Sequence, residues 1–155
     1  MKIKEIMTSP VQTCEPGTNL AAAASMMWDS DCGALPVVDH DGKVVGMITD
    51  RDICMAVVTK RRLASDITVW ETITGKVYSC TADDDAKDAL LLMKRERVRR
   101  LPVVAQNGIL QGVVAMNDFV LRAEEPKGTR APDLSYRDVM EALKSISGHR
   151  ILVGI

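Results

Sequence analysis

Aromatic side chains are scarce in this sequence and make up only 3% of its 155 residues. Apolar residues still account for 46% of the chain, so we expect a core built mainly from aliphatic side chains. The shortage of aromatic rings argues against a surface that stacks the bases of single-stranded nucleic acid. The formal net charge is −1, so no excess of basic charge points to DNA, RNA or an acidic membrane surface.

Metal-binding and targeting patterns are also missing. The four cysteines have no C-x-x-C spacing and there are only two histidines, which argues against a zinc site. Free, mostly buried thiols in a reducing cytoplasm are the simpler interpretation. The opening residues, MKIKEIMTSP, lack the apolar segment of a signal peptide, and no apolar run reaches the length of a membrane span. These features predict a cytoplasmic protein.

Catalytic signatures are absent as well. The sequence has no supported Ser-His-Asp or Cys-His order, no G-x-x-x-x-G-K-[ST] phosphate loop and no G-x-G-x-x-G dinucleotide motif. We therefore assign no catalytic residue and expect no enzyme activity.

One stretch of the sequence occurs twice. GKVVGMITDRD at residues 42–52 returns in altered form as GILQGVVAMND at residues 108–118. LPVV also occurs twice, at residues 35–38 and 101–104, with the same offset of 66 residues. The period is too long and the copies too few for a solenoid. The pattern predicts two copies of one unit that form a pseudo-symmetric pair.

Each copy is expected to have the order β-α-β-β-α. An extended stretch (10–14 or 76–80) precedes a helix, the LPVV strand and a turn that ends in glycine. A second strand (44–49 or 110–115) and a second helix follow. Thr18 is a candidate cap for the first helix of copy one.

The C-terminal part of the chain has a different pattern. Residues 123–134 contain two prolines and a glycine, which is typical of a linker. Ser135 and Asp138 have the spacing of a capping box, and the apolar residues 139, 143 and 146 share one face of the helix that should follow. The last five residues, ILVGI, form a short apolar tail.

Together these motifs resemble a pair of cystathionine-β-synthase-type (CBS) domains, an arrangement called a Bateman module. The resemblance rests on LPVV, the glycine turn and G-h-h-[S/T]-x-x-D, found twice in the same order. It implies an α+β fold of two β-α-β-β-α units related by a pseudo-twofold axis, with a short C-terminal helical extension. The expected boundaries are 1–66 for the first unit, 67–122 for the second, and 123–155 for the linker, helix and tail.

The resemblance also implies where ligands bind. In this family, clefts between the two units commonly bind AMP, ADP, ATP, S-adenosylmethionine or NAD. The motif aspartate accepts hydrogen bonds from the ribose hydroxyls, and the Ser/Thr supports the ribose or phosphate. In this chain the first cleft would hold Thr49 and Asp52, with Lys76 and Val77 lining the phosphate and base regions.

The second cleft is expected to differ from the first. It would hold Asp118, with Val11, Arg99 and Arg100 lining the phosphate and base regions. Ala115 stands where the motif has Ser or Thr, and the two arginines replace a Gly-Ala pair of copy one. One cleft therefore has the full ribose motif without arginines, and the other has arginines and an incomplete motif.

These residue types have alternative interpretations that the sequence leaves open. Thr49 and Asp52 also have the spacing of a helix capping box. Arg99 and Arg100 end the run KRERVRR, which is typical of a solvated helix end, although forked guanidinium groups also suit phosphate.

The resemblance favours a non-catalytic sensor that requires no cofactor, binds an adenosine-type ligand and acts on a separate effector protein. The alternative is a structural dimerisation module that binds no nucleotide. A homodimer is expected, paired through the apolar helix faces LAAAASMM and ALLLM.

Overall fold

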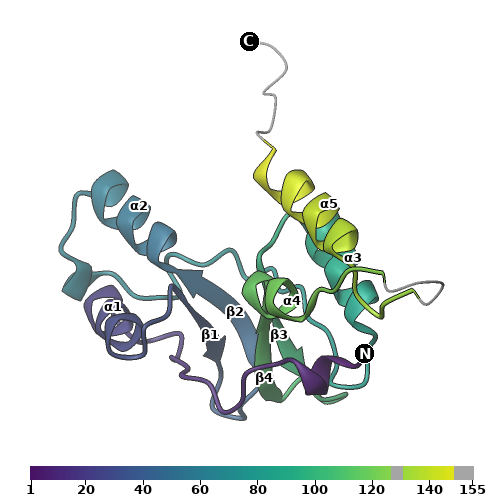
Figure 1. Cartoon of the computed structure of the whole chain (residues 1–155). Helices are drawn as coiled ribbons and strands as arrows, with labels where there is room; N and C mark the ends of the chain where they lie inside the picture. The colour runs from purple at the N-terminus through teal and green to yellow at the C-terminus, as the bar shows by residue number, and fades with distance from the viewer. Residues whose placement is uncertain (127–130, 149–155) are drawn as a thin grey trace. The chain divides into compact units, whose positions relative to one another are not determined.

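The computed structural model describes residues 1–126 and 131–148. These residues form a mixed α and β fold with two small sheets (Figure 1). The predicted ILVGI tail lies outside the described residues. In chain order the elements are η1 (Ile3–Glu5), α1 (Leu20–Asp29), β1 (Ala34–Val38), β2 (Val44–Thr49), α2 (Asp50–Lys60), η2 (Ala64–Asp66), α3 (Ala86–Glu96), β3 (Arg100–Val104), β4 (Leu110–Ala115), α4 (Met116–Arg122) and α5 (Tyr136–Ser147).

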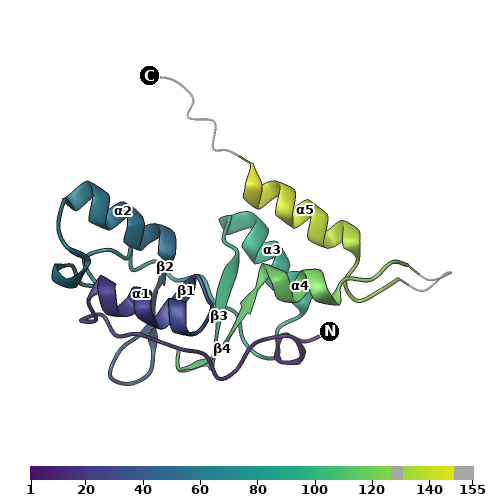
Figure 2. The ribbon, with the colours of Figure 1, turned by 60° about the vertical axis from the view of Figure 1, so that its left-hand side comes forward.

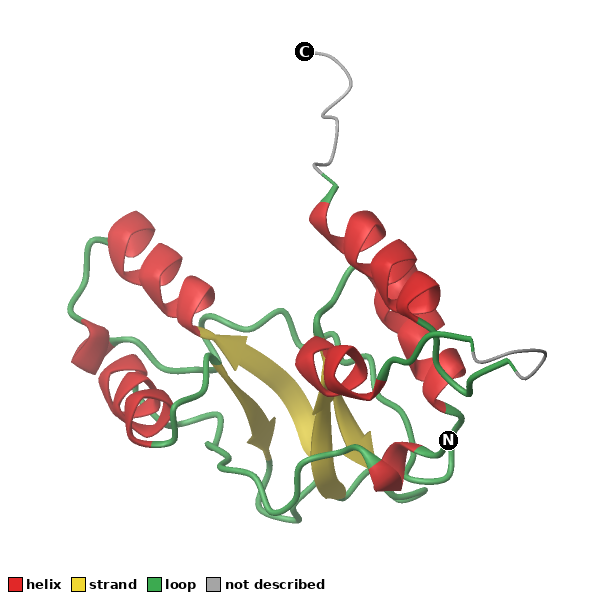
Figure 3. Cartoon of the chain, in the orientation of Figure 1, coloured by secondary structure: helices red, strands yellow, loops and turns green. Residues whose placement is uncertain are grey.

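Each sheet is one hairpin made from the repeated motif (Figure 3). β1 pairs antiparallel with β2, from Ala34 opposite Thr49 to Val38 opposite Val44, and β3 pairs with β4. Both connecting turns use a glycine at positive φ, Gly42 at 77° and Gly108 at 84°, a conformation that glycine adopts without steric cost. The structure thus confirms the predicted strands at 44–49 and 110–115.

The two extended stretches are shorter than expected. Each is reduced to a single parallel bridge, Cys14 to Val37 in copy one and Cys80 to Val103 in copy two. Both cysteines are buried, so these bridges bring the start of each copy into its core. Among the described residues, no helix combines the length and apolar character needed to cross a membrane.

The chain forms two compact units, neither of which is continuous in sequence. The first unit contains Pro10–Val77 and Val104–Gln111, and the second contains Met1–Ser9, Tyr78–Val103 and the described residues from Gly112 onward. This grouping differs from the expected boundaries at 66/67 and 122/123. Residues 1–9 belong with the second unit, residues 67–77 belong with the first, and the C-terminal helix is part of the second unit.

Apolar packing explains why residues 1–9 pack with the second unit and residues 67–77 with the first, an arrangement we call the exchange of segments. Ile3 and Ile6 are buried in the same hydrophobic cluster as Phe119 of the second unit. Val69, which corresponds to Ile3 in the repeat, is buried together with Ile67 in the cluster around Leu35 of the first unit. Burying a side chain of this size contributes about 1.5–3 kcal/mol, which is enough to decide where each segment packs.

The cap of α1 lies one residue after the predicted position. Asn19, and not Thr18, caps α1, because its side chain accepts a hydrogen bond from the backbone N–H of Ala22 at 2.9 Å. The Thr18 hydroxyl accepts instead from the N–H of Glu15, one turn earlier.

The C-terminal helix α5 packs on α3 in the second unit, where Figures 1 and 2 both show the two helices side by side. Val139 and Ala142 are buried between them and the rest of the unit. The predicted capping box is confirmed, since the Asp138 carboxylate accepts from the backbone N–H and the hydroxyl of Ser135 at 3.0 and 2.8 Å. At the other end of α5, Arg97 Nε donates to the Ser145 carbonyl at 3.1 Å.

The packing of α5 corrects one expectation about dimerisation. The ALLLM segment of α3 was expected to pair with a second chain. Ala89, Leu90 and Met93 of that segment are instead buried in the core cluster that also contains Val139 and Ala142 of α5. Most of this apolar face is therefore used within the chain.

The four thiols differ in exposure, which predicts a titration result. Burial raises the pKa of Cys14 to about 11, and burial together with the nearby Asp84 charge raises the pKa of Cys80 to about 12. Cys32 and Cys54 are exposed. Because the thiolate is the reactive form, we expect a thiol reagent at pH 8 to modify two cysteines of the native protein rapidly and the other two only after denaturation. Rapid modification of all four in the folded protein would contradict the structure.

Candidate ligand-binding site

The junction of β2 and α2 positions Thr49 and Asp52. Thr49 is the N-cap of α2 and Asp52 is the third residue of the helix. Asp52 Oδ2 accepts hydrogen bonds from the Thr49 backbone N–H at 2.9 Å and from the Thr49 hydroxyl at 2.7 Å. In return, the Thr49 hydroxyl oxygen accepts from the Asp52 N–H at 3.2 Å. This reciprocal capping box fixes both side chains at the start of the helix.

The junction of β4 and α4 is built the same way but lacks the hydroxyl. Asp118 Oδ2 accepts a hydrogen bond from the backbone N–H of Ala115 at 2.7 Å. The methyl side chain of Ala115 has no oxygen that could accept a hydrogen bond from the Asp118 N–H. Half of the capping interaction therefore survives the Thr-to-Ala difference between the copies. The capping interpretation that the sequence left open for Thr49 and Asp52 holds, and Asp118 makes only the backbone half of such a cap.

Capping leaves one oxygen of each carboxylate unused. All hydrogen bonds to Asp52 and Asp118 end on Oδ2. Among the described residues, Oδ1 of neither side chain accepts a hydrogen bond, and both residues are half-buried. An ionised carboxylate has about four acceptor sites, so each aspartate can cap its helix and still accept from a ligand.

The two predicted arginines lie beside the second junction. The Arg99 carbonyl accepts a hydrogen bond from the N–H of Met116, the first residue of α4, at 2.9 Å. Arg100 begins β3, and both arginine side chains are exposed. The structure thus brings Arg99 and Asp118 to the same strand–helix junction. In copy one the corresponding bond joins Asp50 N–H to the Gly33 carbonyl at 3.2 Å, where no side chain projects.

The remaining predicted residues all belong to the first unit. Lys76 and Val77 fall at the end of the segment 67–77 that joins this unit, which also contains Thr49 and Asp52. Val11 is half-buried in the same unit, whereas Asp118 and the two arginines belong to the second.

The motif glycines, Gly46 and Gly112, allow close approach to the exchanged segments. A Cβ at Gly46 would lie 2.5 Å from Ile73 Cδ1, and one at Gly112 would lie 2.6 Å from the Thr8 carbonyl oxygen. The glycines of G-h-h-[S/T]-x-x-D therefore place the second strand of each hairpin directly against a segment from the other copy.

Sequence reasoning missed a hollow of about 430 Å³ in the first unit. It lies where the end of α1, the following turn and the start of α2 meet. Its lining residues are Ala24, Met27, Trp28, Asp31, Cys32, Gly33, Asp50 and Ile53. The exposed Trp28, one of only two tryptophans in the chain, was the sequence signal that could have indicated this surface.

Comparisons with known proteins agree with the repeat and the hairpins. The CBS domain family matches residues 3–59 and 64–125. The chain is 36% identical over 144 residues to the uncharacterized protein YlbB of Bacillus subtilis (strain 168), covering 90% of this chain and 95% of that protein. It is 32% identical over 139 residues to the CBS domain-containing protein YhcV of the same organism, covering 88% and 97%.

A solved structure gives the same result. The CBS domain pair of protein MJ0100, in complex with 5′-methylthioadenosine and S-adenosyl-L-methionine, matches with a TM-score of 0.72 at 26% identity. The match covers 78% of this chain and 94% of that one. The duplicated hairpins and the family match over most of the chain lead to one conclusion: this protein belongs to the CBS domain family and carries two CBS domains in tandem.

Proposed function

We propose that this chain is a non-catalytic sensor that binds an adenosine-containing ligand at its β2–α2 and β4–α4 junctions. The candidate ligands are AMP, ADP, ATP, S-adenosylmethionine and NAD. The observation that carries the proposal is the unused Oδ1 of Asp52 and of Asp118, each on a carboxylate held in place by its cap. A ribose offers two adjacent hydroxyl donors, and a fixed carboxylate is well suited to accept from them.

The similarity to MJ0100 supports the ligand class. That protein binds two adenosine derivatives with its CBS domain pair, and its sequence is 26% identical to this chain. The composition of the two junctions supports a difference in ligand preference. Thr49 and Lys76 suit a ligand that is bound through its ribose and carries a single charged group. Arg99 and Arg100 suit a ligand with several phosphate groups.

In this proposal the protein is a cytoplasmic homodimer that passes the signal to a separate effector protein. A ligand shifts the balance between two conformations only by its difference in affinity for them. The ligand must therefore contact groups whose positions differ between the two conformations, and in this proposal these groups are the helix starts that carry Asp52 and Asp118.

The test is a thermal-shift series on nucleotide-free protein with each of the five candidates, and with GTP for comparison. A ligand at 100 times its dissociation constant should stabilise the fold by about 2.7 kcal/mol. Removing a hydrogen bond to a charged group costs about 1.5–3 kcal/mol, so Asp52→Ala or Asp118→Ala should weaken binding at its own junction roughly 10- to 100-fold. The other junction should keep its affinity.

Asp138→Ala is the matched control. Asp138 caps α5 through the same pair of bonds that Asp52 makes with Thr49, and it lies in neither candidate site. Asp138→Ala should lower the melting temperature, because α5 loses its cap. The rise in melting temperature that a ligand causes should stay unchanged. If no adenosine ligand raises the melting temperature, or if Asp138→Ala reduces the shift as much as Asp52→Ala does, the sensor proposal is wrong.

A structural dimerisation module is the second candidate function. It is favoured by Ala115, which removes the hydroxyl from one of the two motifs. This candidate predicts a stable dimer whose melting temperature does not respond to any of the ligands, so the same series decides between the two.

A further inference from the structure

The hollow of about 430 Å³ in the first unit lies between one face of α1 and one face of α2. α1 and the turn behind it contribute residues at the helical spacing i, i+3, i+4 and i+7, namely Ala24, Met27, Trp28 and Asp31. α2 contributes Asp50 and Ile53, which are three residues apart and share a face. Asp52 lies about 200° around α2 from Asp50, so the hollow is separate from the candidate site at the β2–α2 junction.

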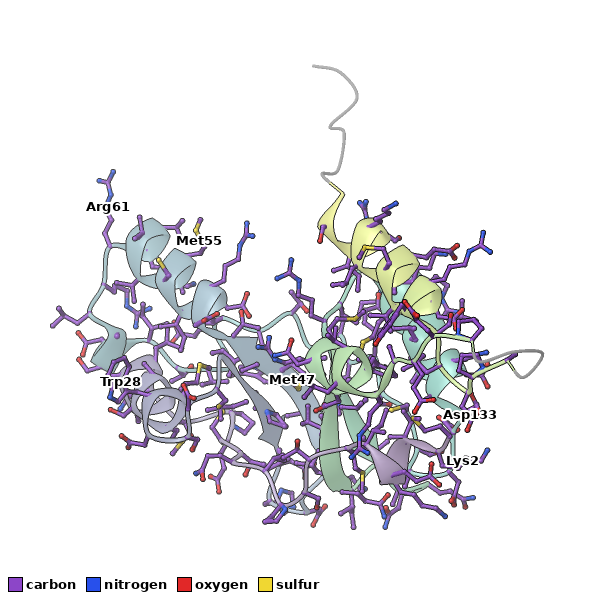
Figure 4. All side chains as sticks on the ribbon, viewed as in Figure 1. Lys2, Trp28, Met47, Met55, Arg61 and Asp133 are labelled. Atoms are coloured by element: carbon purple, nitrogen blue, oxygen red, sulfur yellow. The ribbon has the colours of Figure 1, made fainter. Side chains whose placement is uncertain are left out.

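The lining of the hollow combines apolar surface, an aromatic ring and negative charge. Met27 and Ile53 are buried side chains that give the hollow an apolar base. Trp28, which Figure 4 shows on α1, is 86% exposed, so most of its indole ring takes no part in the core. Asp31 and Asp50 are the charged residues of the lining, and both are negative. An indole face and carboxylates both attract an organic cation.

The negative charge of the hollow is not neutralised within the described part of the chain. Neither Asp31 nor Asp50 forms an ion pair there, and the Asp50 side chain accepts only the N–H of Arg51, at 2.7 Å. Asp29 and Asp31 also stand at the C-terminal end of α1, whose last turn has no basic residue. Carboxylates are unfavourable at this negative end of the helix dipole, so helix stability does not account for them.

The second unit has the opposite charge at the equivalent corner, and there the charge is used. Arg97 stands 66 residues after Asp31, and the two share a rare backbone conformation, with φ of 57° and 48°. Arg97 Nε donates to the Ser145 carbonyl at 3.1 Å, and Lys94 pairs with Glu141. Basic side chains therefore hold the carbonyl end of α5 at this corner. The acidic corner of the first unit suits a group of the opposite sign.

We propose that the hollow between α1 and α2 binds a small organic cation, an ammonium or guanidinium group on an apolar stem. The cationic group lies against the face of Trp28 and the carboxylates of Asp31 and Asp50, and the stem lies on Met27 and Ile53. Pockets that bind small molecules have volumes of about 300–1,000 Å³, a range that includes this hollow. The two carboxylates repel phosphate, so this ligand is not the nucleotide of the proposed function, and the inference does not depend on that function.

Tryptophan fluorescence of the full chain tests the proposal directly. The sequence has two tryptophans, and Trp70 does not line the hollow, so Trp70→Phe leaves Trp28 as the one fluorescent indole. The probes are butylamine and butylguanidine, with butanol as their uncharged counterpart, all at constant ionic strength. Both cations should cause a saturable change in Trp28 emission, because the charged group binds beside the ring. Butanol should cause none.

Two matched substitutions separate a specific contact from general attraction. Asp31→Asn keeps the shape of the side chain, and asparagine tolerates the positive φ at this position. It should weaken binding of both cations about 10-fold or more, because a charge-assisted hydrogen bond is lost. Asp29→Asn removes the same charge from the same end of α1, but Asp29 does not line the hollow. It should change the affinity by less than about 2-fold, because solvent and salt screen an exposed charge.

Several results would overturn the proposal. One is an emission that responds to neither cation, or to butanol as strongly as to butylamine. Another is an equal loss of affinity in Asp29→Asn and Asp31→Asn, which would mean diffuse attraction by negative charge. An emission that changes when the protein is diluted, and not with the cations, would show that a second copy covers the hollow. The thermal shift that adenosine ligands cause in Asp31→Asn should equal that of wild type, which keeps the sensor proposal separate.

Discussion

Replacing Gly112 by alanine is expected to destabilise the protein far more than replacing Gly46. The new methyl group at position 112 would lie 2.6 Å from the Thr8 carbonyl oxygen, which is backbone. Thr8 cannot move aside easily, because it exchanges two hydrogen bonds with Val113, of 2.9 and 3.1 Å. Overpacking of this kind costs about 1–3 kcal/mol, and a clash with fixed backbone belongs at the upper end.

Gly46→Ala is the matched change in the first unit. Its methyl group would meet Cδ1 of Ile73, the far end of a flexible side chain that can rotate away. The lower entropy of the unfolded chain offsets about 0.4–1 kcal/mol of the remaining cost. Urea unfolding followed by circular dichroism should place Gly112→Ala about 2 kcal/mol or more below Gly46→Ala. Equal losses in the two variants would mean that the exchanged segment 1–9 is not held as described.

Introducing a charge at Ala142 should detach α5. Ala142 is 1% exposed within the core of the second unit. A buried carboxylate without a partner is so costly that local opening of the helix is the cheaper outcome, and we expect a loss of about 3 kcal/mol for Ala142→Asp. Hydrogen exchange of the α5 amides should then approach the rate of an unfolded segment while β1 and β2 stay protected.

Met140→Asp makes the same charge change two residues earlier on α5. Met140 is 53% exposed, so its substitution should change stability by less than about 0.5 kcal/mol. Should both variants open α5 equally, net charge on the helix and not burial of Ala142 would be the cause.

Local patterns in the sequence predicted most of the secondary structure. β2 and β4 have the predicted bounds, and Ser135 caps α5 as expected, because strand alternation, glycine turns and capping boxes depend on residues close in sequence. The sequence predicts the cap of α1 one residue too early, at Thr18 and not at Asn19. Thr18 and Asn19 are both good caps, and only the three-dimensional course of the chain shows that the Thr18 hydroxyl is engaged with Glu15.

Non-local packing could not be read from the sequence. The expected boundary at 66/67 follows the repeat, but nothing in the periodicity of Ile3 or Ile67 shows which core each one enters. The same holds for α5, whose apolar face was evident while its docking on α3 was not. For the candidate site, spacing identified Thr49 and Asp52 as neighbours, but which carboxylate oxygen the cap uses is a matter of geometry.

The exchange of segments has a consequence for the order in which the chain matures during synthesis. The cluster around Leu35 draws on residues no later than Ile73, so the first core can form once residue 77 has left the ribosome. Ile3 and Ile6 are made earlier but must wait for Leu101 and Phe119. At 5–20 residues per second this delay is roughly 5–20 s. For the last part of that wait, between residue 77 and Phe119 and roughly 2–8 s at the same rate, the nascent protein carries one finished core and an apolar N-terminal segment that has not yet been buried.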